Sequence, residues 1–300
     1  MSTQNGYAPG LDGIVAAETA LSHVDGLKGE LIIAGFPLAR LAANATFEET
    51  IFLLWNGRLP TQTELTNLKN ELVALRPLPA ATLNLLREAA RARTTPMNAL
   101  RMASATLDLD SREADHLTMA KIVVARIATI VASYHRLRQG AEPVVPDPKL
   151  SHAANFLYML TGEQPSDARV RGLETYLNTV VDHGLNASTF AAHVIVATQS
   201  DLVSAIAGAI GALKGPLHGG APGPALDTVF EIGTADRAEA ILRAKLDAGE
   251  RLMGFGHRVY KVRDPRAEVL STAAEKMFRA DGDMALYELA KSVEETAVRL

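Results

Sequence analysis

The chain has 300 residues, and its 30 Lys plus Arg against 34 Asp plus Glu leave a formal net charge of −4. This balance excludes a protein that mainly holds nucleic-acid backbone, and a composition of 48% hydrophobic and 21% charged residues excludes a disordered chain. The absence of cysteine excludes disulfide scaffolds, thiolate zinc sites and cysteine nucleophiles, and the length allows about two domains.

The N-terminal segment shows no targeting signal and one short β pattern. Residues 1–10 have neither the basic nor the apolar region of a secretory signal. Between residues 10 and 35, Val- and Ile-containing runs are broken by Asp25-Gly26 and Gly29, which predicts a small β element. Alternating strand–helix units are absent elsewhere, which disfavours a parallel-sheet nucleotide fold.

The next segments carry helix-start and helix-stop signals. Thr46 and Thr61 each begin a Thr-x-x-Glu capping box, and the first of these helices should stop at Gly57. Pro77 and Pro79 then interrupt the chain.

Longer helices are expected in the middle of the chain. Apolar residues repeat at helical spacing from about Ser111 to Arg138, and Ser151 caps a helix that Gly162 closes. Further helices are predicted over residues 168–181, 188–199 and 202–213. The last of these is the longest uncharged apolar stretch, and it is too short to cross a bilayer, so we predict no membrane partner. The run of helical segments predicts an all-α protein.

Two Gly- and Pro-rich breaks mark the last third of the chain, at residues 215–224 and 254–257. A helix from Thr234 or Asp236 to Gly249 separates them, and one helical face runs over residues 286–300 without a stop signal. We regard the two breaks as the candidate site.

His218 lies in the first break, between Leu217 and Gly219, where bare backbone lets a ligand approach. A helix beginning after it would keep the imidazole neutral, so that the ring could donate a hydrogen bond to a carbonyl group. The alternative is a turn histidine without a role.

His257 lies in the second break, in a cluster with Lys261, Arg258, Arg263 and Arg266 that suits an anionic substrate. The alternative is a solvated basic loop. A third histidine, at residue 183, stands beside a helix cap, where a structural role is the more common one. The spacing of the three histidines contains no short ligand pair, so no metal site is predicted.

Three motifs in the same order resemble those of the citrate synthase family, and the likeness runs along essentially the whole chain. The motifs are Gly254-Phe255-Gly256-His257-Arg258-Val259-Tyr260-Lys261-Val262-Arg263-Asp264-Pro265-Arg266, Lys214-Gly215-Pro216-Leu217-His218-Gly219-Gly220-Ala221, and Asp182-His183 with Leu185-Asn186-Ala187-Ser188-Thr189.

This resemblance implies an all-α fold with a large helical domain over residues 1–215 and a smaller one over residues 216–300. It also implies a homodimer that condenses an acyl-CoA with a 2-oxo acid and then hydrolyses the thioester. The missing secretory signal and the absence of cysteine fit a cytoplasmic location. The expected ligands are oxaloacetate and acetyl-CoA, with the coenzyme A thioester as substrate and no separate cofactor.

The resemblance also implies residue roles. His218 would polarise the thioester carbonyl for enolisation, and His257 would bond the keto oxygen of oxaloacetate. His183 and Arg266 would hold the oxaloacetate carboxylates. The residues expected against coenzyme A are Leu213, Lys214, Gly215, Gly254, Phe255 and Gly256.

The family's general base is an aspartate that would fall after Leu300, so we name no base and expect weak or absent turnover from these 300 residues. Two alternatives therefore stay open beside a citrate synthase. One is a 2-methylcitrate synthase that uses propionyl-CoA, and the other is a non-catalytic family member that binds oxaloacetate or coenzyme A. A truncated product would also explain the departure.

Overall fold

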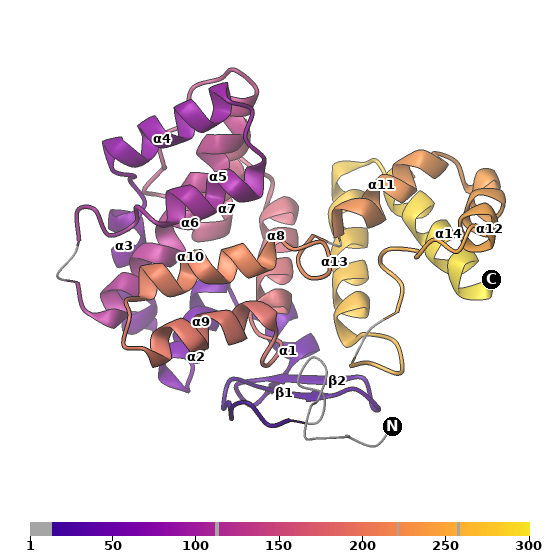
Figure 1. The fold of residues 1–300 in the computed structure, drawn as a ribbon, viewed down its shortest axis with the longest axis horizontal. Helices are drawn as coiled ribbons and strands as arrows, with labels where there is room; N and C mark the ends of the chain where they lie inside the picture. The colour runs from indigo at the N-terminus through magenta and orange to yellow at the C-terminus, as the bar shows by residue number, and fades with distance from the viewer. Residues whose placement is uncertain (1–13, 112–113, 221, 257–258) are drawn as a thin grey trace.

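The computed structural model describes residues 14–111, 114–220, 222–256 and 259–300. Within them, helices dominate and one three-stranded sheet lies near the N-terminus, so the predicted all-α class with a minor β element is confirmed (Figure 1). The strands are β1 Ser22–Asp25, β2 Glu30–Ile33 and β3 Phe36–Pro37. The helices are α1 Leu38–Asn44, α2 Phe47–Asn56, α3 Gln62–Leu75, α4 Ala80–Arg91, α5 Pro96–Ser104, α6 His116–Arg138, α7 His152–Thr161, α8 Asp167–Val180, α9 Ala187–Ala197, α10 Leu202–Leu213, α11 Pro222–Ile232, the 3-10 turn η3 Ala235–Arg237, α12 Ala238–Asp247, α13 Pro265–Asp281 and α14 Ala285–Arg299.

The sheet is antiparallel in the order β1-β2-β3, with Ser22 opposite Ile33 and Asp25 opposite Glu30. At the turn between β1 and β2, the Asp25 carboxylate accepts hydrogen bonds from two backbone N–H groups, each at 3.0 Å. The strands start later than the sequence indicated, and β3 lies beyond Gly35, outside the predicted β element.

The capping signals predicted several helices correctly. Both capping boxes form, since the hydroxyl groups of Thr46 and Thr61 accept the backbone N–H three residues on. The serine cap of α7, its stop at Gly162 and the bounds of α10 are confirmed as well.

Three predictions in the later segments were wrong or incomplete. Helix α6 begins at His116 rather than near Ser111, because Asp115 caps it by accepting the N–H of Thr118 at 2.8 Å. Helix α11 begins inside the predicted 215–224 break, since residues of a first turn need no N–H partner within the helix. Helix α13 was not predicted at all.

Buried side chains in the described residues form four apolar clusters, of which the largest and the one in the last third of the chain bear on the site. The largest cluster joins α4, α5, α6 and α10, through residues such as Leu86, Ile122 and Val203. Helix α6 is long and apolar enough to cross a membrane, yet 56% of its apolar window is buried in the protein, as a core helix requires. A separate cluster, which includes Ile232 and Leu242, joins α11, α12 and α14.

Helix α13 lies at the junction between these two parts, and it packs against α8 and α1 (Figure 1). Its N-terminus therefore comes close to the segment that follows α8. The candidate site is built around this junction and around the end of α10.

Candidate functional site

The loop between α8 and α9 carries His183 and is attached at both ends. The side-chain oxygen of Asn186 accepts two N–H groups from the first turn of α9, at 2.9 and 3.0 Å. The N–H of Gly184 donates to the hydroxyl oxygen of Ser22 in β1, at 3.0 Å. The position of this loop is thus set by one helix and by the sheet.

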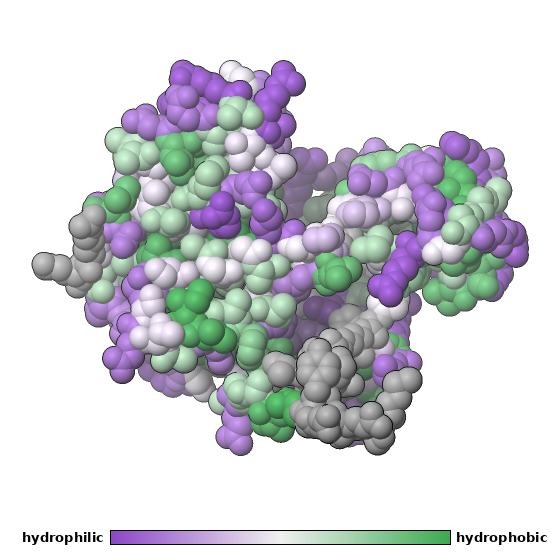
Figure 2. Space-filling model, viewed as in Figure 1, coloured by the Kyte–Doolittle hydropathy of each residue, from purple (hydrophilic) through white to green (hydrophobic). Residues whose placement is uncertain are grey.

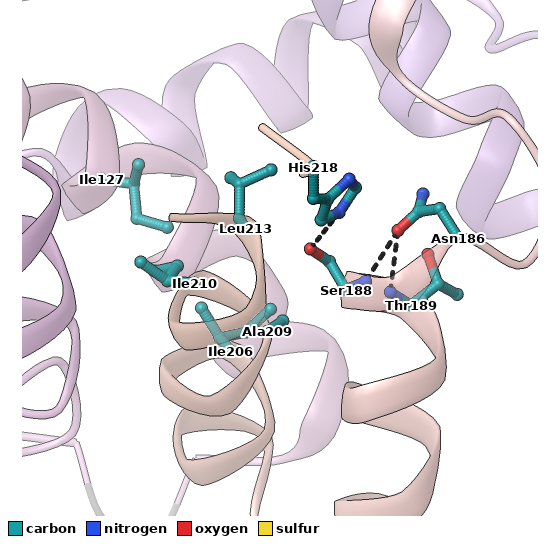
Figure 3. Close-up of a pocket in the computed structure, with 9 residues that line it drawn as sticks. All are labelled: Ile127, Asn186, Ser188, Thr189, Ile206, Ala209, Ile210, Leu213 and His218. Carbon is teal, nitrogen blue, oxygen red and sulfur yellow. Dashed lines mark hydrogen bonds between the residues drawn. The ribbon is translucent and has the colours of Figure 1, made fainter. Parts of the chain in front are cut away.

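His218 lies in the tight turn after α10. Its backbone N–H donates to the carbonyl of Gly215, and that of Gly219 donates to the carbonyl of Leu213, each at 3.0 Å. A Cβ atom on residue 219 would lie only 2.7 Å from the Leu213 carbonyl oxygen, so the turn needs glycine there. The turn brings Nε2 of His218 to 2.7 Å from Oγ of Ser188 (Figure 3).

A pocket of about 270 Å³ opens beside this imidazole. Figure 3 shows aliphatic side chains of α10 on one side of it, and His218 with the first turn of α9 on the other. The lining residues are Ile127, Asn186, Ser188, Thr189, Ile206, Ala209, Ile210, Leu213 and His218. The wall is mostly apolar, with an imidazole at its edge, which suits a small apolar group next to a polarised carbonyl.

His183 contacts Tyr260, which follows the second glycine-rich break. Nε2 of His183 lies 3.0 Å from the Tyr260 hydroxyl oxygen, and the two rings meet edge-on with centroids 5.5 Å apart. Tyr260 is only 4% exposed. Burial raises its pKa, and the charge of Asp264 raises it further while Arg266 lowers it, so the hydroxyl keeps its proton at neutral pH.

Arg266 lies in the first turn of α13, with its guanidinium 6.0 Å from the centre of the Tyr260 ring. Asp264 caps this helix by accepting the Arg266 N–H at 2.9 Å. The same carboxylate accepts from Nη2 of Arg266 at 2.6 Å and from Nε at 3.0 and 3.1 Å. Arg266 is therefore already arranged to bind a carboxylate through two nitrogens.

The α8–α9 loop connects these two groups of side chains. His183 contacts Tyr260, and Ser188, five residues further along, contacts His218. Five residues span at most about 18 Å of chain. The structure therefore brings His183, Arg266 and His218 into one region of the molecule.

The other predicted site residues lie at both breaks. Leu213 lines the pocket, and Nζ of Lys214 donates to the side chain of Asn98 in α5 at 2.6 Å. Phe255 is 38% exposed. Across the described residues, no hydrogen bond joins residues 213–215 to residues 254–256. His257 lies outside the described residues.

The structure adds three residues to which the sequence analysis gave no role: Ser188, Tyr260 and Asp264. Ser188 stood in a quoted motif beside the Asn186 cap, but nothing in its spacing pointed to a histidine 30 positions away. Asp264 had a local signal, because an Asp-Pro pair commonly begins a helix. No group of three or more potential metal ligands occurs in the part of the chain that the structure covers.

Comparison with known proteins gives a consistent result. The family model described as the C-terminal domain of citrate synthase matches residues 10–300. A citrate synthase of Haloferax volcanii is 42% identical over 296 residues, covering 95% of this chain and 78% of that protein. A 2-methylcitrate synthase of Mycobacterium tuberculosis is 41% identical over 272 residues, covering 89% and 69%.

A solved structure is similar as well. It is a ternary complex of citrate synthase from Thermoplasma acidophilum with carboxymethyl coenzyme A and oxaloacetate. The two chains are 31% identical with a TM-score of 0.90, over 97% of this chain and 78% of that one.

Proposed function

The chain belongs to the citrate synthase family, which makes it an acyltransferase of that type. We propose that it condenses acetyl-CoA with oxaloacetate and that water then hydrolyses the resulting thioester, which gives citrate and coenzyme A. One observation carries this proposal. His183 in the α8–α9 loop contacts Tyr260, beside which Arg266 lies, and Ser188, five residues after His183, contacts His218.

His218 has the role of polarising the thioester carbonyl. A hydroxyl of Ser188 that donates to Nε2 leaves the imidazole proton on Nδ1, from which it can be donated to the carbonyl oxygen. A donor placed at the developing enolate oxygen lowers the barrier by roughly 3 kcal/mol, while a general base, to which no residue is assigned, takes up the methyl proton. The turn after α10 and Ser188 together hold the ring in place for this role.

Oxaloacetate is held by His183 and Arg266, with His257 bonded to its keto oxygen. Arg266 supports this assignment because its guanidinium already pairs with a carboxylate, that of Asp264. A substrate carboxylate has the same shape and charge, so it can share or replace that contact. Holding both substrates side by side removes the cost of a bimolecular encounter.

Coenzyme A has its place along residues 213–215 and 254–256. Residues 213–215 form the end of α10 and the bend that follows it, and residues 254–256 lie in a loop. Glycines at 215, 254 and 256 leave the backbone open to close approach. The reaction as proposed needs no metal or further cofactor, since imidazoles perform both carbonyl-polarising steps.

A second candidate is the use of propionyl-CoA, as in a 2-methylcitrate synthase. A 2-methylcitrate synthase is among the relatives at 41% identity. The pocket beside His218 is lined by Ile127, Ile206 and Ile210, which offer an apolar surface to one more methyl group. Parallel assays with acetyl-CoA and propionyl-CoA separate the two candidates.

The test of the proposed function is calorimetric titration with oxaloacetate, combined with an assay for release of the coenzyme A thiol. We expect one oxaloacetate to bind per chain and His183→Ala to weaken it at least about tenfold, the effect of a lost charge-assisted contact. We expect thiol release to be weak or absent without an assigned general base, and any release to require oxaloacetate. A parent chain that binds no oxaloacetate would overturn the proposal.

We also propose that the protein works as a homodimer through the face formed by α9 and α10. None of the residues of α9 is buried, and Phe190, Val194 and Val196 are exposed. Figure 2 shows apolar side chains over this face. A second copy is the fitting occupant, because a symmetric pair of such faces would bury both apolar surfaces. Sedimentation of the parent and of Val194→Glu tests this, with a monomer expected for the variant.

We propose a cytoplasmic location, with which the absence of cysteine is compatible. We also propose a large domain over residues 1–215 and a small domain over residues 216–300, supported by the separate core of α11, α12 and α14. Limited proteolysis tests this division.

A further inference from the structure

We propose that Tyr260 is a positioning residue for the oxo-acid site, where its hydroxyl fixes the orientation of the His183 imidazole and its ring supports the Arg266 guanidinium. This inference rests on the proposed function, because it needs oxaloacetate to bind between His183 and Arg266. Tyr260 acts through these two residues and need not touch the substrate.

Tyr260 contacts both His183 and Arg266. Its hydroxyl oxygen lies 3.0 Å from Nε2 of His183, and its ring meets the imidazole at 65°. The guanidinium carbon of Arg266 lies 6.0 Å from the centre of the same ring. One side chain thus contacts both residues that are expected to bind the substrate carboxylates.

A hydrogen bond to Nε2 restricts the imidazole in two ways. It limits rotation of the ring about its bond to Cβ, and a hydroxyl that donates to Nε2 keeps the proton of the neutral ring on Nδ1. The orientation and the protonation of the His183 ring are then both defined. Burial of Tyr260 excludes water that would compete for Nε2.

The backbone around Tyr260 is fixed by the turn between β1 and β2. The N–H of Lys261 donates to the carbonyl of Gly26 at 2.9 Å. A Cβ atom on residue 26 would lie 2.2 Å from the carbonyl oxygen of Val259, so only glycine allows this close approach. The residues on both sides of Tyr260 therefore pack against this turn.

The loop that carries His183 is attached to the same sheet, through the Gly184 N–H and the Ser22 hydroxyl at 3.0 Å. Ser22 and Gly26 lie at the two ends of one short strand and its turn. The sheet is thus a common support for His183 and Tyr260. Attachment of both segments to one sheet fixes the distance between His183 and Tyr260. A tyrosine that only fills a core would not need such an attachment.

The experiment compares the parent chain with Tyr260→Phe, which removes the hydroxyl and keeps the ring. Tyr287→Phe is the matched control. The hydroxyl of Tyr287, in α14, likewise contacts one side chain, but its partner is the hydroxyl oxygen of Ser271 at 3.2 Å rather than a histidine. Calorimetry measures the dissociation constants for oxaloacetate and for coenzyme A. Nitrogen-15 NMR of the histidine rings reports the protonation of His183, and thermal melting reports stability.

For Tyr260→Phe we expect oxaloacetate to bind about three- to tenfold more weakly, the usual effect of one lost hydrogen bond. The His183 ring resonances should shift, the affinity for coenzyme A should stay at the parent value, and the melting temperature should fall by only about 2–4 °C, the effect of one lost hydrogen bond. Tyr287→Phe should change neither the affinities nor these resonances. Equal loss of both affinities would indicate a general structural role and overturn the inference.

Unchanged oxaloacetate binding by Tyr260→Phe, in a parent that does bind it, would overturn the role of Tyr260 and leave the proposed function intact. Absence of oxaloacetate binding by the parent would overturn the proposed function and the role of Tyr260 together. A second variant, Tyr260→Leu, removes the ring as well, so it should weaken oxaloacetate binding more than Tyr260→Phe does.

Discussion

Nε2 of His218 lies 2.7 Å from the hydroxyl oxygen of Ser188, which joins the turn after α10 to the first turn of α9. The thiol release of the parent chain is expected to be weak, and we expect Ser188→Ala to lower it by a further factor of about three to ten, because one hydrogen bond that orients the imidazole is lost. Oxaloacetate affinity should not change. Thr198→Ala, at the other end of α9, is the control, and an equal loss of rate in both variants would refute this prediction.

Replacement of Arg266 by lysine tests carboxylate recognition. Lysine keeps the charge but loses the planar pair of donors, so we expect oxaloacetate to bind about ten- to a hundredfold more weakly. Calorimetry measures this. Arg263→Lys is the matched control, because Arg263 pairs with Glu294 at 2.9 Å and has no proposed contact with substrate. Equal affinities for Arg266→Lys and the parent would rule out a paired contact with the substrate.

The turn at Gly26 should be sensitive to a single methyl group. In Gly26→Ala the new Cβ overlaps the carbonyl of Val259, so the segment around Tyr260 must move. We expect the free energy of unfolding to fall by about 1–3 kcal/mol, as for an overpacked site, and oxaloacetate affinity to fall with it. Gly223→Ala is the control, since a Cβ there meets no atom within 4 Å. Denaturant unfolding of the two variants decides the matter, and a Gly26→Ala chain as stable as the parent would contradict the close approach.

The pocket beside His218 should set the length of the acyl group. Ala209→Leu places a larger side chain in the pocket wall, so the ratio of propionyl-CoA to acetyl-CoA use should fall about tenfold, a typical value for one methylene. The control is Ala207→Leu, on the same helix but not in the pocket lining. If both variants keep the ratio of the parent, the acyl group lies elsewhere.

Buried His152 should make stability depend on pH. Burial lowers its pKa to about 4, the charge of Arg76 adds to the decrease and that of Glu48 opposes it. Because the folded-state pKa is below the unfolded value of 6.5, stability is complete above pH 6.5 and falls as the pH decreases toward 4. The loss should total roughly 3 kcal/mol, and denaturant unfolding at a series of pH values measures it.

His152→Phe keeps an aromatic ring against Phe47, whose ring centre lies 5.1 Å away in the parent, and removes the titrating group. Its stability should therefore vary less between neutral and acidic pH. His135→Asn, at an exposed position on α6, should keep the pH dependence of the parent. The same slope in all three proteins would assign the acid sensitivity to other groups.

Local signals in the sequence predicted much of the fold. The caps at Thr46, Thr61 and Ser151 worked because an N-cap is a contact between near neighbours, which spacing alone reveals. The same reasoning missed α13, because the Asp-Pro pair at residues 264–265 was considered only as part of a motif. It also placed the start of α6 too early, since Asp115 was not recognised as its cap.

The candidate site could be predicted only residue by residue. His183 and His218 were selected from the glycine and cap residues around them, and Arg266 from its basic cluster. The contacts Ser188–His218 and Tyr260–His183 join residues 30 and 77 positions apart, and no local pattern encodes them. They depend on how α8, α9 and α13 pack, which only the folded chain determines.

The packing of α8 against α13 has a consequence for the proposed oxo-acid site at His183 and Arg266. The two helices run antiparallel, with Arg169 paired to Asp281 at 2.8 Å and Met277 against Gly172, while His183 and Arg266 follow at the opposite end. A bulkier residue at position 172 would push against the Met277 side chain and so shift α13 relative to α8. Under the proposed assignment, such a shift would change the separation of His183 and Arg266 at the other end, and with it the length of dicarboxylate that fits, without altering either side chain.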